Sequence, residues 1–137
     1  MNQSDYVQHD GLALAERARR GDVSPVELLE SAIAQMSRVQ PRIHAVCWEE
    51  LEAARAAARA METDLPQGAF AGVPMLLKDV ALSAKGFCLS HGSRLFAGVR
   101  SAQHSELATR LRDAGFNFFG RSTTPEFGSN STTEAPV

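Results

Sequence analysis

The sequence predicts an α/β fold in which a mostly helical first half leads into the start of a sheet. Residues 75–77 form a short apolar run of the kind that builds a buried strand. Residues 107–119 have the pattern of a helix, a glycine and a strand, which is the local unit of α/β proteins. We therefore expect one domain, with residues 1–64 as a helical lead-in and residues 65–137 as the start of the α/β core.

The clearest helix start lies at residues 24–27, where the sequence is Ser-Pro-Val-Glu. The serine oxygen can accept a hydrogen bond from the glutamate amide, while the glutamate side chain reaches back to the serine amide. Proline also suits the first position of a helix. Apolar residues recur behind it at helical spacing: Val26, Leu29, Ile33 and Met36. We expect Pro41 to end this helix.

Weaker signals place the other elements of the first half. Residues 11–20 and 49–61 have helical composition, and Gly21 follows the first of them. Within the second, Glu52 precedes Arg55 by three residues, so the two side chains can pair on one face. Residues 43–47 alternate between apolar and more polar side chains, which indicates a short strand.

The second half carries fewer helical signals. A helix is expected at residues 103–114, with Gly115 as the C′ residue that closes it. Residues 116–119 then form a strand. The segment 120–137 is rich in serine, threonine, proline and glycine, and we expect it to be a loop.

Composition narrows the class of protein. The formal net charge of −2 argues against nucleic acid or an anionic membrane surface as the main partner. The sequence contains no apolar run of the length that a membrane span requires. The first residues lack the basic start and apolar core of a secretion signal, so a cytoplasmic location is the expectation.

Cysteine and histidine give no sign of a metal or redox centre. Cys47 and Cys88 fit neither a zinc pattern nor a redox CxxC motif, and we interpret them as free thiols. The four histidines are scattered and form no HExxH arrangement. We therefore expect no metal site and no cofactor.

Lys78 is the most informative residue of the chain. It follows an apolar run, Val73-Pro74-Met75-Leu76-Leu77, and precedes Asp79. We expect a lysine in this position to lie near or inside the core, where loss of hydration lowers its pKa and lets it accept a proton from a serine. The spacing alone leaves open a structural lysine that is paired with Asp79 or with a distant carboxylate.

Several motifs, in order and at similar spacing, resemble the amidase signature family. They cover most of the chain: Ser24-Pro25-Val26-Glu27, Ile43-His44-Ala45-Val46, Gly72-Val73-Pro74 with Lys78-Asp79, Gly92-Ser93, Leu111-Arg112-Asp113-Ala114-Gly115 and residues 120–128. The Thr132-Thr133-Glu134 segment is similar to that of amidases related to nylon-oligomer hydrolases.

The resemblance implies a fold and a reaction. The fold would be the N-terminal part of an α/β/α amidase-signature domain with a mixed sheet. The reaction would be hydrolysis of an amide carbon–nitrogen bond through a Ser–cis-Ser–Lys triad. Lys78 would be the triad lysine and would accept the proton of a bridging serine, which activates the nucleophilic serine. The substrate would be a small-molecule amide, and a homo-oligomer is an open option.

The same resemblance places both catalytic serines in later blocks of the family's sequence. Val137 is the last residue here, so we expect only the lysine of the triad in this chain and no activity from the chain alone. Ser90 and Ser93 follow the lysine, but the family gives neither that role. In relatives, the loop that corresponds to Gly128 and Ser129 forms a wall of the acyl pocket, so these two are the candidate substrate-binding residues.

Two alternatives stay open. The glutaminase (A) subunit of a tRNA-dependent amidotransferase shares these motifs and passes ammonia to a partner. A truncated, non-catalytic binding module is an alternative of another class. The gene sequence beyond the codon for Val137 would distinguish the enzyme from this module.

Overall fold

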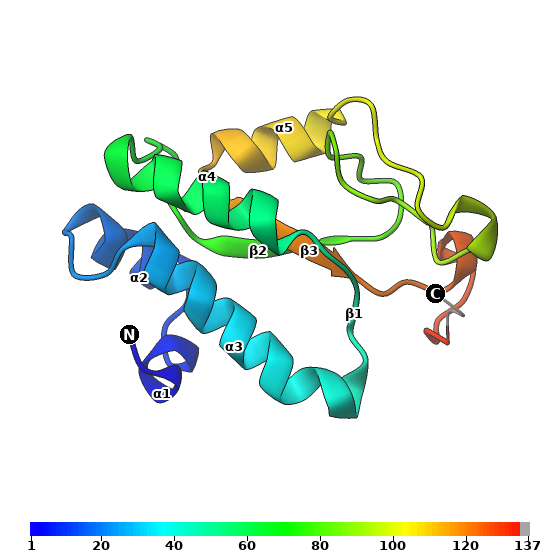
Figure 1. The fold of residues 1–137 in the computed structure, drawn as a ribbon, viewed down its shortest axis with the longest axis horizontal. Coiled ribbons are helices and arrows are strands. Elements are labelled where there is room, and N and C mark those ends of the chain that lie inside the picture. Colours follow the sequence, from blue (N-terminus) through cyan, green and yellow to red (C-terminus); the bar gives the residue numbers. More distant parts are fainter. Residues whose placement is uncertain (135–137) are drawn as a thin grey trace.

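A three-stranded mixed sheet lies at the centre of the fold, with helices on both of its faces (Figure 1). The computed structural model describes residues 1–134. The helices are α1 (Gln3–Val7), α2 (Gly11–Arg19), α3 (Pro25–Ile43), α4 (Leu51–Thr63) and α5 (Glu106–Asp113). The strands are β1 (Val46–Glu49), β2 (Pro74–Lys78) and β3 (Asn117–Ser122), and two short 3-10 turns occupy Arg94–Phe96 and Glu126–Gly128.

The strand order is β1-β3-β2, with β3 in the middle. β2 runs parallel to β3, and their register pairs Lys78 with Ser122. β1 runs antiparallel to β3, so the sheet is mixed, as predicted. The parallel pair is joined by a long connection that contains α5.

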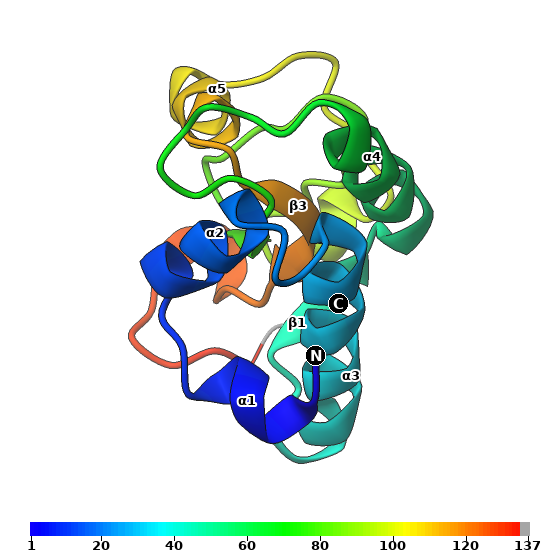
Figure 2. The same ribbon diagram turned by 90° about the vertical axis from the view of Figure 1, so that its left-hand side faces the viewer.

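Alternation along the strands explains why helices cover both faces. Phe119 packs in a cluster with α3 and α4, whereas Phe118 packs with Ala108 of α5 on the opposite face. Leu77 belongs to the α5 cluster, and Leu76 packs against the α3 and α4 cluster. Figure 2 views the fold along the sheet, with α5 above β3 and α3 below and to the side.

The predicted helix ends are largely confirmed. The Ser24 side chain accepts from the Glu27 amide at 3.1 Å, and the Ser24 amide donates to Glu27 Oε2 at 2.9 Å, which completes the capping box. Gly115 follows the C-cap of α5 with φ +100°, a conformation that favours glycine. Arg55 donates to Glu52 at 3.2 Å, and it also contacts Glu30 of α3.

Three expectations were wrong. Pro41 does not end α3; it lies inside the last turn, and the helix continues to Ile43. A proline this close to the end removes only one late hydrogen bond, and the helix closes on His44 in the left-handed conformation. Consequently Ile43 is helical, and the strand predicted from residue 43 begins only at Val46.

The third error concerns the start of the last loop. Gly120, Arg121 and Ser122 continue β3 because they pair with β1 and β2 on either side. Gly120 fits a narrow space there, since a Cβ atom would lie 2.5 Å from the carbonyl oxygen of Trp48. The predicted loop therefore begins at Thr123, and its last three residues lie outside the described part.

Candidate active site

Lys78 is the last residue of β2, at the end of the sheet where β2 and β3 both finish. Its side chain is exposed, which contradicts the expectation that it lies near or inside the core. Leu77 enters the α5 cluster and Leu76 packs against the α3 and α4 cluster, whereas Lys78 lies at the very end of the strand and belongs to neither cluster. Within residues 1–134, the Lys78 ammonium forms no ion pair. The neighbouring Asp79 carboxylate accepts hydrogen bonds from Ser90 instead.

Asp79 is fully buried directly after Lys78. Its carboxylate accepts from the Ser90 amide at 2.8 Å, from the Ser90 hydroxyl, and from the Gly92 amide at 3.2 Å. These three donors satisfy a charge that would be costly to bury alone. The carboxylate therefore holds the turn at residues 90–92 against the end of β2.

Arg121 is the largest fully buried side chain of the described chain. It reaches from β3 to the segment after β2, where it donates to the carbonyl oxygens of Cys88, Lys78 (3.0 Å) and Leu82 (2.8 Å). Burial lowers the pKa of the guanidinium, and the nearby Asp79 carboxylate acts in the opposite direction. The backbone beneath Lys78 is thus fixed by a buried cation and a buried anion.

Ser90 and Ser93 are placed as supporting residues. Both are buried. The Ser90 hydroxyl donates to Asp79 and accepts from the Trp48 indole at 3.4 Å. The Ser93 hydroxyl accepts from the Leu95 amide at 3.3 Å. Within residues 1–134, neither hydroxyl has a hydrogen bond to Lys78.

Gly128 and Ser129 lie near the same end of the sheet as Lys78. A Cβ atom on Gly128 would lie 3.6 Å from Val80 Cγ2, two residues after the lysine. Ser129 is exposed, and its hydroxyl donates to the Glu126 carbonyl at 2.7 Å. The structure thus brings Lys78 and the turn at Gly128 and Ser129 to the same end of the sheet, although fifty residues separate Lys78 from Gly128 in the sequence. Figure 1 shows the C-terminal segment beside the loop that carries residues 90–100.

Sequence reasoning included Arg121 in a family motif and noted Ser90 after the lysine, but it missed the supporting role of both. The signal for Arg121 was available, because a charged residue followed the apolar strand residues Phe118 and Phe119. Its three acceptors lie 33 to 43 residues away in sequence, so no local pattern could identify them. Ser90 is likewise defined only by contacts across the fold.

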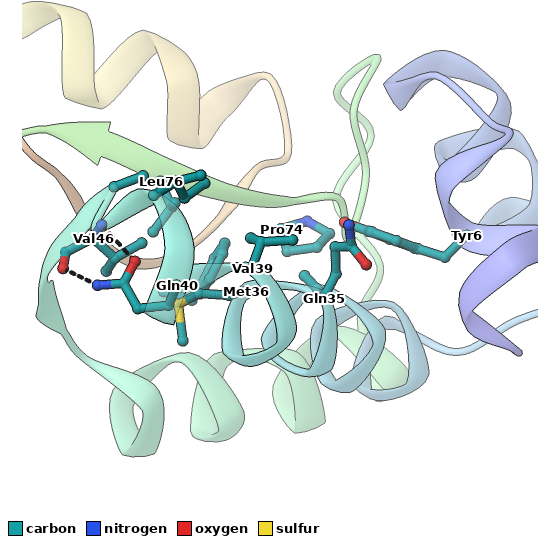
Figure 3. A pocket seen from close by; sticks show the side chains of 12 residues that line it. Tyr6, Gln35, Met36, Val39, Gln40, Val46, Pro74 and Leu76 are labelled. Carbon is teal, nitrogen blue, oxygen red and sulfur yellow. Dashed lines mark hydrogen bonds between the residues drawn. The ribbon is translucent and has the colours of Figure 1, made fainter.

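An apolar groove of about 320 Å³ lies between α1, α3 and the sheet. Figure 3 shows its walls: Gln40 is hydrogen-bonded to the backbone of Val46 near Leu76, and Pro74 lies further along the groove. Among its described lining residues there is no aspartate, glutamate, lysine or arginine. The groove offers apolar contact area, and Tyr6 is the one titratable side chain among its described lining residues.

Among residues 1–134, no group of three or more histidine, cysteine, aspartate or glutamate side chains could hold a metal ion. None of the helices in that part of the chain has both the length and the apolarity to cross a membrane.

Comparison with known proteins identifies the family. The Amidase family model matches residues 27–137, so the chain belongs to the amidase family, whose members are the amidase signature enzymes. The chain is 39% identical to the 6-aminohexanoate-cyclic-dimer hydrolase of Paenarthrobacter ureafaciens over 98% of this chain and 26% of that protein. It is 35% identical to a glutamyl-tRNA(Gln) amidotransferase subunit of Salinispora arenicola, over 96% of this chain and 27% of that protein.

Solved structures agree. A structure of 6-aminohexanoate cyclic dimer hydrolase superposes with a TM-score of 0.81 at 37% identity, covering 93% of this chain and 26% of that one. A bacterial aryl acylamidase of the amidase signature family superposes with a TM-score of 0.84 at 26% identity, covering 91% and 27%. The chain therefore spans about a quarter of the length of the relatives it matches.

Proposed function

We propose that the protein carrying this chain is an amidase that hydrolyses small-molecule amides, with Lys78 as the lysine of a Ser–cis-Ser–Lys triad. The bridging and nucleophilic serines would come from polypeptide outside these 137 residues. The observation that carries the proposal is the Lys78 ammonium, which ends β2 with no carboxylate partner among residues 1–134. A lysine locked in an ion pair would stay protonated, whereas an unpaired lysine can become a base once further polypeptide covers it.

The roles of the chain's own residues follow from this placement. Lys78 would accept the proton of the bridging serine, and that serine would in turn take the proton of the nucleophile as it attacks the amide carbonyl. Asp79 and Arg121 would hold the backbone of the lysine through buried hydrogen bonds. The exposed turn at Gly128 and Ser129 would face the acyl part of the substrate.

The full-length protein allows a direct test with a matched control. Lys78 and Lys85 are the only lysines of the chain, and both are exposed. Lys78→Ala should leave the fold intact and lower kcat by about 10³- to 10⁶-fold, the range measured for triad members. Lys85→Ala should leave turnover unchanged. Near-normal turnover in Lys78→Ala would remove Lys78 from the mechanism.

The assay should include the 6-aminohexanoate cyclic dimer, aryl acylamides and free glutamine. The first two are motivated by relatives that act on such compounds by their names. Glutamine tests the second candidate, a glutaminase component of a tRNA-dependent amidotransferase, which the 35% identity to such a protein favours. Glutamine hydrolysis that needs partner subunits would support that candidate; hydrolysis of the other amides by the protein alone would support the first. If the protein hydrolyses none of these amides, the non-catalytic binding module is the alternative that remains.

A further inference from the structure

We infer that Asp79 is a positioning residue that fixes the turn at residues 127–129 relative to the end of β2, where Lys78 lies. The inference rests on the proposed function only for its catalytic consequence; the mechanical coupling stands on contacts within the chain. Asp79 is not assigned contact with the substrate. It acts through the backbone of two successive turns.

The first link joins Asp79 to the turn at residues 90–92. The Ser90 and Gly92 amides, on either side of His91, both donate to the Asp79 carboxylate. His91 itself has φ +55°, a left-handed conformation that is unfavourable for a residue with a side chain. Amides that converge in this way form a small anion-binding hollow, and here the anion belongs to the protein. The carboxylate therefore stabilises a turn that is intrinsically strained.

The second link joins this turn to Phe127. The Phe127 amide donates to the His91 carbonyl at 2.8 Å. The rings of the two residues stack with centroids 6.1 Å apart and planes at 25°, and Phe96 meets both rings edge-on. Phe127 also has a left-handed backbone, with φ +53°. A backbone hydrogen bond and a ring contact thus tie the start of the turn at residues 127–129 to His91.

The third link returns to β2. Gly128 faces Val80, the residue after Asp79, since a Cβ atom added to the glycine would lie 3.6 Å from Val80 Cγ2. Gly92 also packs closely against the chain just before the turn at residues 127–129, since a Cβ atom on it would lie 2.6 Å from the Thr124 carbonyl oxygen. The contacts thus run from Asp79 through residues 90–92 and 127–128 and back to Val80. Loss of the Asp79 charge would remove the buried anion that holds the first of these contacts in place.

A coupling role makes a different prediction from a merely structural one. Damage to the fold in general would raise amide exchange throughout the sheet. Loss of a specific tether would raise exchange at Ser90, Gly92 and Phe127 and leave the amides of β3 protected. The Phe127 amide is the decisive probe, because it does not bond to Asp79 directly.

The experiment compares amide hydrogen exchange in the full-length protein and three variants. Asp79→Asn keeps the size of the side chain and removes its charge. Ser90→Ala removes the hydroxyl bond to Asp79 and the bond that the same hydroxyl accepts from the Trp48 indole, and it keeps both amide bonds. Asp113→Asn, at an exposed carboxylate of α5, is the control. Asp79→Asn should speed exchange at Phe127 by about tenfold or more, Ser90→Ala by less, and the control should change nothing.

Each outcome decides the matter. Unchanged Phe127 exchange in a folded Asp79→Asn variant would overturn the coupling. If Asp79→Asn does not fold, Ser90→Ala decides in its place. In the amide assay, Asp79→Asn should raise KM as well as lower kcat, whereas Lys78→Ala should act mainly on kcat. Local exchange changes without any amide hydrolysis by the parent protein would uphold the tether and refute the proposed function.

Discussion

The Nη1 atom of Arg121 donates a hydrogen bond of 3.0 Å to the carbonyl oxygen of Lys78. A fully buried guanidinium on the central strand thereby holds the backbone of the exposed lysine that we propose as the base. The same guanidinium reaches the carbonyls of Leu82 and Cys88, so it fixes the whole segment that leaves β2. The rigidity of the candidate site comes from beneath it, from side chains that never meet solvent.

This arrangement predicts that Arg121 cannot be replaced by lysine. Arg121→Lys keeps the charge, but a single ammonium cannot match the planar fork that reaches three separate carbonyls. We expect a loss of about 2–4 kcal/mol in the free energy of unfolding, measured by urea denaturation. Arg110→Lys is the control, because Arg110 pairs with Glu106 on the surface and should change stability by about 0.5 kcal/mol or less. Equal effects of the two changes would contradict the clamp.

A pair of glycines separates steric from conformational effects. Gly92 and Gly21 have similar left-handed backbones, with φ +67° and φ +75°. A Cβ atom at Gly92 would lie 2.6 Å from the Thr124 oxygen, whereas at Gly21 it would meet nothing within 4 Å. Gly21→Ala should cost about 1–2 kcal/mol in unfolding free energy from the backbone alone. Gly92→Ala should cost about 1–3 kcal/mol more, because backbone must move to admit the methyl group.

Local signals in the sequence were sufficient for some of this architecture. The cap at Ser24 depends on residues three positions apart, and Gly115 ends α5 through its own φ angle, so both could be predicted. The prediction that Pro41 ends α3 was wrong because a helix tolerates a proline within its last turn, and the sequence pattern did not show where that turn lies. The Lys78 motif was found from the sequence, but its exposure was not, since exposure depends on which polypeptide covers the strand end.

The buried polar residues show the same limit more sharply. Asp79 precedes its partner Ser90 by eleven residues, and Arg121 follows Cys88 by thirty-three. No periodicity links such positions, because each contact joins the end of a strand to the irregular segment at residues 88–90. The sequence could therefore indicate the chemistry of the candidate site but not the network that supports it.

Cys47 should make stability depend on alkaline pH. Burial, with a contribution from the Asp79 carboxylate, raises the pKa of this thiol from 9.0 to about 12. Because the folded pKa is raised, the stabilisation is fully present below about pH 9 and is lost as the pH rises towards about 12. The stability advantage of the parent over Cys47→Ala, measured by urea unfolding, should therefore shrink across this range. The native thiol should also react slowly with iodoacetamide at pH 8.5; rapid alkylation would contradict the raised pKa.

The 137-residue chain on its own should self-associate. β1 and β2 each have one edge without a partner strand among residues 1–134, and the apolar groove beside α3 is open to solvent. Ile43 lines this groove with 59% exposure, whereas Leu12 is 55% exposed on α2 and does not line it. Sedimentation velocity should reveal concentration-dependent association that Ile43→Gln weakens and Leu12→Gln leaves unchanged. A sharp monomer peak at every concentration would contradict this, and would mean that the exposed apolar surface is too dispersed to hold two copies together.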